Sequence, residues 1–116
     1  MLGELLRRFG LEELDPRWVL VGEISAEEFG QSGGGGRPGW VMLSGHDADG
    51  AAGKLETMNR WYGGMMHELG HAFGLPDAAG DDGTCMSGAM YVYPNCFFTE
   101  GQKTAIFNGP YGSFLS

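Results

Sequence analysis

The stretch that most constrains this chain runs from His67 to Asp77 and has the pattern H-E-x-x-H-x-x-G-x-x-D. His67 and His71 are four residues apart, so on a helix they lie on one face, one turn apart. Their imidazole nitrogens then point toward one position, where zinc is bound at about 2.0–2.1 Å from each nitrogen. Glu68 lies beside that position without having to be a ligand. The pattern therefore predicts a zinc-binding helix in which Glu68 is the general base that deprotonates zinc-bound water.

The end of the motif predicts how a third ligand reaches the same position. Gly74 allows the helix to end in a left-handed turn, and Pro76 prevents the helix from continuing. The chain can then turn back and offer Asp77 as the third ligand. A chance H-E-x-x-H on a core helix would need none of these three residues.

The first ten residues of this stretch match the metzincin signature, which usually ends in a third histidine. With Asp77 in that place, the sequence resembles the snapalysin family of small secreted neutral metalloproteases, over roughly the second half of the chain. The resemblance implies a compact α+β fold of the zincin type. Such a fold has a small mixed sheet, a backing helix, an active-site helix, a Met-turn and a C-terminal helix.

Length and composition agree with one small domain. At 116 residues we expect a single catalytic domain, with an N-terminal part at 1–74 and a C-terminal part at 75–116. The 22 glycines raise the entropy cost of folding, so we expect a zinc ion and a disulfide to support the fold.

The net charge is 7 − 15 = −8, which disfavours nucleic acid and anionic membranes as partners. No apolar run is long enough to span a bilayer. We expect a monomer that acts on a peptide or protein substrate. Residues 1–4 lack the basic-then-apolar pattern of a signal peptide. With the snapalysin resemblance, this favours a mature secreted domain, and a cytosolic protein is the alternative.

Apolar spacing predicts the main elements. Leu2, Leu5, Leu6 and Phe9 indicate an amphipathic helix, which residues 11–14 could extend by a turn. We expect a buried strand at 18–21, a flexible loop at 32–36, a second strand at 40–44, a long helix from near 55 to 73, and a last helix at 99–107. The resemblance implies that strand 40–44 forms the upper edge of the cleft and pairs with extended substrate.

Two further segments have alternative interpretations. Gly63 and Gly64 lie on the histidine side of the long helix, which indicates that this face is kept clear or that another backbone passes close to it. The loop with His46, Asp47 and Asp49 lacks the full calcium-loop pattern. We therefore favour a solvated turn there over a structural calcium site.

The resemblance also assigns roles after the motif. A Met-turn, whose methionine lies beneath the zinc site, falls at Met86, with Met90 as the rival. Tyr93, in a segment that resembles the wall of the S1′ pocket, and Tyr91 are candidate donors to the oxyanion, although packing in a loop explains each of them equally well. The resemblance places a disulfide between Cys85 and Cys96, and two free buried cysteines are the alternative.

We thus expect a zinc-dependent endopeptidase with His67, His71 and Asp77 as ligands and Glu68 as the base. Two alternatives remain at this point. One is a zinc-stabilised binding module that has lost proteolysis. The other is a gluzincin-type peptidase, which needs a glutamate from a second helix, and the first glutamate after the motif is Glu100.

Overall fold

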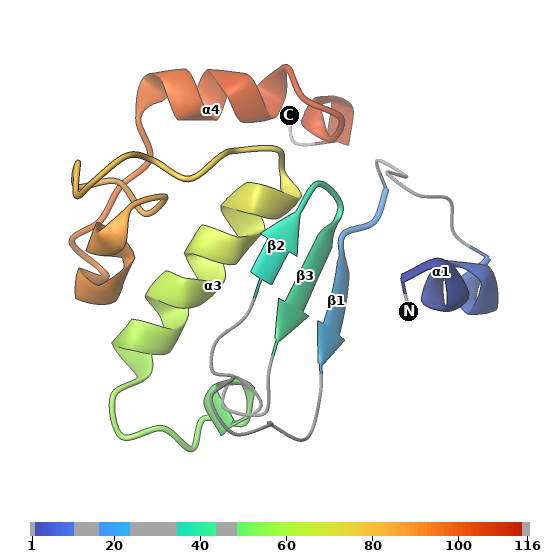
Figure 1. The fold of residues 1–116 in the computed structure, drawn as a ribbon, viewed down its shortest axis with the longest axis horizontal. Helices are drawn as coiled ribbons and strands as arrows, with labels where there is room; N and C mark the ends of the chain where they lie inside the picture. Colours follow the sequence, from blue (N-terminus) through green and yellow to red (C-terminus); the bar gives the residue numbers. More distant parts are fainter. Residues whose placement is uncertain (1, 11–16, 24–34, 44–48, 115–116) are drawn as a thin grey trace.

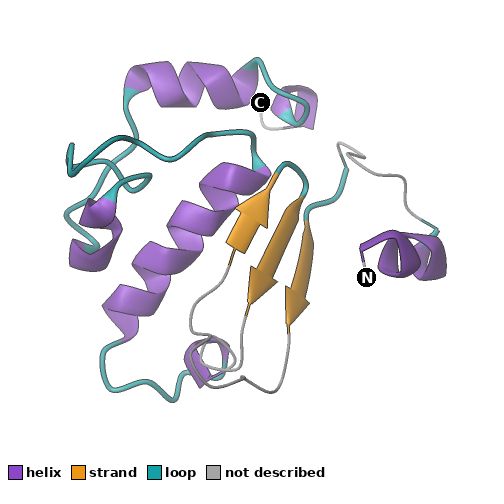
Figure 2. Ribbon diagram, viewed as in Figure 1, coloured by secondary structure: helices purple, strands orange, loops and turns teal. Residues whose placement is uncertain are grey.

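The structure is a computed structural model that describes residues 2–10, 17–23, 35–43 and 49–114. Its elements are α1 (Leu2–Phe9), β1 (Leu20–Glu23), β2 (Gly35–Arg37), β3 (Trp40–Leu43), α3 (Met58–Ala72), the 3₁₀ helix η1 (Gly88–Val92), α4 (Glu100–Phe107) and a second 3₁₀ helix, η2 (Gly112–Phe114) (Figure 1). The described strands form a small mixed sheet, and helices flank it (Figure 2). The predicted α+β class is therefore confirmed.

Some predictions fall where the structure gives no description. The extra turn at residues 11–14, the first part of the glycine loop at 32–34, and His46 and Asp47 all lie outside the described residues. Asp49 is exposed in a helical turn at 49–51. None of the helices within the described part of the chain has the length and apolar character needed to cross a membrane.

The sheet has the strand order β1-β3-β2. β3 pairs with β1 in parallel and with β2 antiparallel, so both of its backbone edges are occupied. The prediction that residues 40–44 form the cleft edge is therefore wrong, and β2 is the edge strand beside α3 (Figure 1). The loop prediction is also wrong at Gly35 and Gly36, which pair with Met42 and Val41.

The hairpin between β2 and β3 explains why a glycine run forms a strand. Pro38 and Gly39 connect the two strands, and Gly39 has a φ of 80°. A proline followed by a glycine with positive φ is the arrangement of a type II turn. The Gly39 N–H donates to the carbonyl of Ala72 at 2.7 Å, so the turn also binds the last residue of α3. The hairpin is thus held against the end of the helix.

β1 begins two residues later than predicted and is not buried along its length. Trp18 precedes the strand, and both Trp18 and Val21 are 52% exposed. Among the described strands, β1 is at the edge and pairs only with β3. On the next residue, Gly22, an added Cβ would lie 2.9 Å from the Trp40 ring. Trp40 therefore covers this part of β1, which a strand pattern alone does not reveal.

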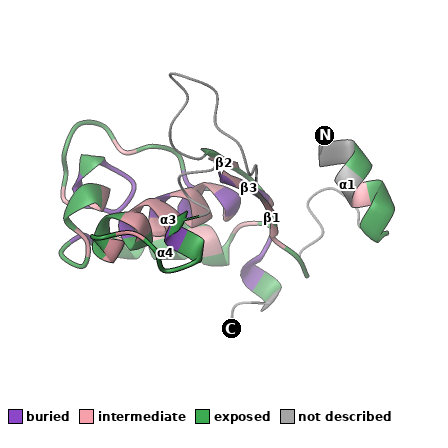
Figure 3. Cartoon of the chain, turned by 90° about the horizontal axis from the view of Figure 1, so that it is seen from below, coloured by how far each residue is buried: buried purple, intermediate pink, exposed green. Residues whose placement is uncertain are grey.

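The core lies between the sheet and α3. Val41 and Leu43 from β3 pack with Ala72 from α3. Val19, Met65 and Leu69 extend this cluster. Figure 3 shows buried positions concentrated along β3, α3 and the segment after α3. α3 thus contributes one face to the core.

α1 has the predicted bounds but does not cover the sheet. It stands apart from the other elements in Figures 1 and 3, and Phe9 is 71% exposed. The amphipathic pattern predicted the helix correctly, because spacing fixes only which residues share a face. It does not fix what that face contacts, so α1 is not the expected backing helix.

The C-terminal helix has the predicted start and end. Thr99 caps α4, and its hydroxyl accepts from the Gln102 N–H while the Gln102 side chain accepts from the Thr99 N–H. This is the capping box that the sequence predicted. Asn108 ends the helix. The tail after it had no predicted role, but Tyr111 is buried and packs edge-on against Phe73.

Candidate metal centre

α3 carries both histidines of the motif. It runs from Met58 to Ala72, so it begins three residues later and ends one residue earlier than predicted. His67 and His71 lie on one face, with ring centroids 4.7 Å apart and Nε2 atoms 3.1 Å apart. His67 is buried and His71 is half-buried. The predicted convergence of the two rings is present.

The end of α3 forms the turn that the motif predicted. Gly74 has a φ of 100°. Its N–H donates to the carbonyl of His71 at 2.9 Å, and the Leu75 N–H donates to that of Gly70 at 2.9 Å. These two bonds are the Schellman arrangement that follows a left-handed residue at a helix end. The turn places the Leu75 carbonyl within 2.8 Å of His71 Nδ1.

Asp77 returns to the histidine pair after this turn. Its Oδ1 lies 3.1 Å from His67 Nε2 and 2.9 Å from His71 Nε2. The side chain of Asp77 is 75% exposed, whereas those of the histidines are 11% and 16% exposed. The three predicted ligands therefore form one group, which is closed on the helix side and open toward solvent at the carboxylate.

The hydrogen bonds of the two rings show that this group fits a cation. His67 Nδ1 is 2.9 Å from the Cys85 carbonyl, and His71 Nδ1 bonds the Leu75 carbonyl. A carbonyl oxygen only accepts, so each Nδ1 carries a proton, and in the neutral form of each ring the lone pair is then on Nε2. Two lone pairs and the Asp77 carboxylate then face one another. Acceptors at this distance repel one another unless a proton or a cation lies between them, so the group could hold a metal ion.

The separations also suit zinc. Ligands at about 2.0–2.1 Å in a tetrahedral site are roughly 3.3 Å apart. The three separations here are 3.1, 3.1 and 2.9 Å. The differences amount to a few tenths of an ångström. The two nitrogens and one carboxylate oxygen are therefore a donor set that could hold zinc without rearrangement of the backbone.

Glu68 lies against the edge strand β2. A Cβ added at Gly36 would lie 2.6 Å from the Glu68 carbonyl oxygen, 2.9 Å from Glu68 Oε2 and 2.9 Å from His71 Cβ. β2 therefore contacts α3 through bare backbone, and Oε2 of Glu68 is shielded from solvent. The carboxylate is placed beside an edge strand and one residue from a ligand.

Met86 lies against the helix at the site. It is fully buried, and a Cβ added at Gly70 would overlap its sulfur. Its carbonyl accepts from the Ala78 N–H at 2.9 Å, next to Asp77. Met90, the rival for the Met-turn, lies in η1, where its carbonyl faces Gly63 instead. Of the two methionines, Met86 is the one that contacts Gly70, which lies between the two histidines of the motif.

The two helical glycines have different surroundings. A Cβ at Gly63 would overlap the Met90 carbonyl oxygen, so the predicted close backbone is present there. A Cβ at Gly64 would meet nothing within 4 Å. Arg60 adds a second contact to η1, since its guanidinium lies 4.9 Å from the centre of the Tyr91 ring. η1 is therefore fixed on the first half of α3.

Tyr93 is half-buried and packs beside Gly63 of α3, one helical turn before His67. Its ring packs edge-on against Tyr62, and the residue joins a cluster with Cys85 and Cys96. These contacts are those of a packing residue. A role for Tyr93 as oxyanion donor stays a prediction.

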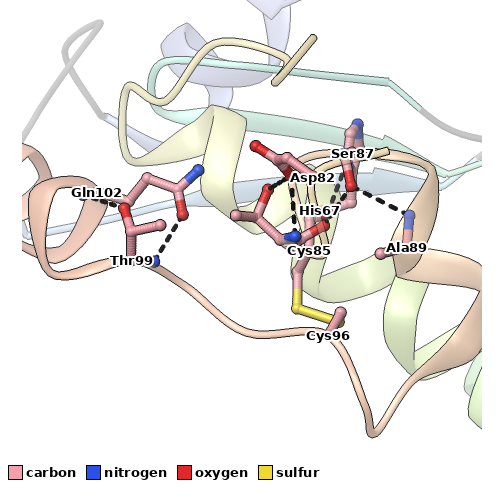
Figure 4. Close-up of a disulfide and its surroundings, with 9 residues drawn as sticks. His67, Asp82, Cys85, Ser87, Ala89, Cys96, Thr99 and Gln102 are labelled. Atoms are coloured by element: carbon pink, nitrogen blue, oxygen red, sulfur yellow. Dashed lines mark hydrogen bonds between the residues drawn. A yellow bond between two sulfur atoms is a disulfide. The ribbon is translucent and has the colours of Figure 1, made fainter. Parts of the chain in front are cut away.

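The predicted disulfide is present. Cys85 and Cys96 are bonded, with Cα atoms 4.9 Å apart, and both are buried (Figure 4). The adjoining loop is anchored by Asp82, whose Oδ1 accepts from the Thr84 hydroxyl at 2.7 Å and from the Thr84 N–H at 2.9 Å. The hydrogen bonds from the Thr84 hydroxyl and N–H lower the pKa of Asp82 below its ordinary value.

Sequence reasoning missed two parts of this site. One is β2, whose Gly36 covers Glu68. The Pro38-Gly39 pair after it is a turn signal that could have revealed the hairpin. The other is the pair of carbonyls, at Leu75 and Cys85, that bind the histidine rings. Backbone acceptors leave no trace in residue identity, so no sequence pattern could have found them.

Comparison of the chain with protein-family models, with curated protein sequences and with solved structures found no match. The functional argument therefore depends on the motif and on the geometry of its residues.

Proposed function

We propose that this protein is a zinc-dependent endopeptidase. The observation that carries the proposal is the meeting of three acceptor atoms, from His67, His71 and Asp77, with Glu68 next to His67 on the same helix. Zinc held by these residues would supply Lewis acidity, which acidifies water and polarises a carbonyl. The same arrangement of residue types is the one that the snapalysin resemblance implies.

The histidines and Asp77 would contribute different donor atoms to the zinc site. The two histidines offer neutral nitrogens whose orientation is fixed by the carbonyls of Cys85 and Leu75. Asp77 adds a negative charge and a harder oxygen donor, which reduces the net positive charge at the site. Its exposure leaves the solvent side of the site accessible to a substrate.

Glu68 is the proposed proton carrier. Its carboxylate is adjacent to a ligand and shielded on one side by β2. We expect it to accept a proton from the attacking water and to deliver a proton to the leaving amine. A carboxylate in this position serves both proton transfers, so its loss affects the whole reaction.

β2 is the proposed binding edge for substrate. It is the edge strand beside α3, and Gly36 within it lies against Glu68. An extended peptide can bind such an edge through backbone hydrogen bonds. The peptide would then pass over the Glu68 carboxylate. The proposed role therefore moves from the predicted strand at 40–44 to β2, Gly35–Arg37, because β3 (Trp40–Leu43) lies between two strands.

The structure disfavours the gluzincin alternative. Glu100 begins α4, and its carboxylate bonds Lys103 at 2.7 Å. Asp77, and not Glu100, lies with the histidine pair. The bonded Cys85 and Cys96 are compatible with an oxidising compartment, so we propose a secreted protein.

The test is a digest of a peptide library and of casein by the zinc-loaded protein, with and without chelator. Glu68→Gln keeps the size of the side chain and removes its basicity. We expect it to bind zinc and fold as the wild type does, while cleavage falls by at least ~10²–10⁴-fold. Glu56→Gln is the matched control, since Glu56 is exposed and precedes α3.

Each result has a defined meaning. Cleavage by Glu68→Gln at the wild-type rate would remove Glu68 from the mechanism. Zinc binding by the wild type without chelator-sensitive cleavage of any peptide would favour the binding module.

A further inference from the structure

The segment Cys85-Met86 contacts the metal site at three points. The Cys85 carbonyl bonds His67 Nδ1 at 2.9 Å. The Met86 sulfur lies against Gly70, and the Met86 carbonyl bonds the N–H of Ala78. These two adjacent residues thus contact all three parts of the site: His67, Gly70 of α3, and Ala78, which follows Asp77.

This segment is held in place from its far side. The side chain of Cys85 is bonded to Cys96. The Cys85 N–H donates to the Phe97 carbonyl at 2.9 Å, and the Phe97 N–H donates to that of Gly83 at 3.4 Å. The disulfide and this short parallel bridge fix one stretch of backbone to another. Figure 4 shows His67 beside Cys85, whose side chain is bonded to Cys96.

We propose that Cys85 is a positioning residue for His67. Its carbonyl fixes the tautomer and the orientation of the imidazole, and the bond to Cys96 keeps that carbonyl in place. The disulfide therefore contributes to zinc affinity as well as to folding. This inference depends on the metal site of the proposed function but not on peptide hydrolysis.

The physical reason is the geometry of the ring. His67 faces Asp77 through Nε2, so as a ligand it must present the lone pair of that nitrogen, and in the neutral ring this requires the proton on Nδ1. An acceptor at Nδ1 favours that tautomer and limits rotation of the ring. If the carbonyl moves, both tautomers and several orientations become populated. Zinc binding must then restore one of them, which lowers the affinity.

The first test weakens the carbonyl and leaves the disulfide intact. Native chemical ligation at the Thr84–Cys85 junction joins residues 1–84 to a synthetic segment of residues 85–116. In the synthetic segment an ester replaces the amide between Cys85 and Met86, which makes the Cys85 carbonyl a poorer acceptor. A control ester between Val92 and Tyr93 weakens an acceptor of the Asn95 N–H, inside the same loop and away from His67.

Two readouts are taken from the ester proteins. Zinc affinity is measured by competition with a chromophoric chelator. The tautomer of His67 is read from the ¹⁵N shifts of its ring in the zinc-free protein. We expect several-fold weaker zinc binding and a growing share of the Nε2–H tautomer in the 85–86 ester alone. Equal affinity and an unchanged tautomer in the two esters would refute the proposal.

The second test removes the disulfide. In the double variant Cys85→Ala/Cys96→Ala, we expect zinc affinity to fall by about 10-fold, within the ~10–100-fold range typical of outer-shell changes. Thr99→Ala is the matched control, because it destabilises α4 by removing the hydroxyl that accepts from the Gln102 N–H. A loss of affinity as large in Thr99→Ala would show a general effect of instability and contradict the proposal. If the double variant does not fold, the ester proteins decide.

The outcomes separate this inference from the proposed function. Wild-type protein that binds zinc but cleaves no peptide, with the 85–86 ester weakened in zinc binding, upholds the positioning role and refutes the peptidase. Wild-type protein that cleaves peptide, with equal zinc affinity in both esters, upholds the peptidase and refutes the positioning role of Cys85.

Discussion

Gly63 and Gly64 are neighbours on α3 whose replacement by alanine should have opposite effects on stability. A Cβ at Gly63 would overlap the carbonyl oxygen of Met90 and would lie 2.9 Å from the Met90 carbonyl carbon and 3.0 Å from Tyr93 Cβ. These two separations are roughly 0.5–1 Å below the favourable range for carbon atoms. A Cβ at Gly64 would meet nothing within 4 Å.

The magnitudes follow from two opposing terms. In a helix, alanine is more favourable than glycine by about 0.8–1 kcal/mol. Overpacking costs about 1–3 kcal/mol and occasionally more. At Gly63 the obstacle is backbone inside the loop closed by Cys85 and Cys96, which moves less easily than a side chain. We therefore expect Gly63→Ala to destabilise by about 1–2 kcal/mol net and Gly64→Ala to stabilise by up to about 1 kcal/mol.

The assay is urea unfolding and thermal melting of the two variants beside the wild type, in zinc-free buffer with the disulfide intact. For a chain of this size, 1 kcal/mol corresponds to roughly 3–6 °C in Tm, so the two variants should differ by about 3–18 °C. If Gly63→Ala melted at or above the wild-type temperature, η1 would not lie on Gly63, and the contact between η1 and α3 would be wrong.

Two other predictions concern aspartates near the site. Asp77→Ala should lower zinc affinity by more than the ~10–100-fold caused by outer-shell changes, because it removes a charged ligand atom. The control Asp81→Ala makes the same change in charge and should bind zinc as the wild type does. Equal zinc affinity in the two variants would exclude Asp77 as a ligand. Because Thr84 lowers the pKa of Asp82 in the folded protein, the stability from this carboxylate is present above its unfolded pKa of about 3.9 and is lost as pH falls through the lower folded value. The Tm difference between wild type and Asp82→Asn should therefore shrink below about pH 4 in chelator-treated protein, and a difference that stayed constant from pH 6 to pH 2, within about 1 °C, would contradict this assignment.

The sequence predicted the parts of the site that depend on local rules. Helical spacing brings His67 and His71 together, and Gly74 has the left-handed conformation that ends the helix. The capping box at Thr99 has the same origin. Each of these features is decided within a few residues, so residue identity and spacing are sufficient to specify it.

The parts that failed depend on contacts between distant segments. The apolar pattern predicts the strand β3 (Trp40–Leu43), but the central place of this strand in the sheet depends on β2, whose glycines conceal it in the sequence. Trp18 has a strand-forming side chain and yet lies outside β1, because β1 pairs with β3 only from Leu20 onward. The tail residue Tyr111 is buried by Phe73, which is far away in sequence. Propensity cannot supply such information, because it describes each segment without its neighbours.

Three glycines of this chain allow other elements to approach α3 closely, which explains them better than chain flexibility does. Three separate elements contact α3 at a glycine: β2 through Gly36, η1 at Gly63 and the Met86 side chain at Gly70. A side chain at any of these positions would displace the element that covers it. Gly36 lies beside Glu68, and Gly63 and Gly70 lie on either side of the segment that carries the first histidine. The entropy cost of these glycines is thus offset by the contacts that β2, η1 and Met86 make with α3. These contacts leave the ligand atoms of the two histidines facing Asp77.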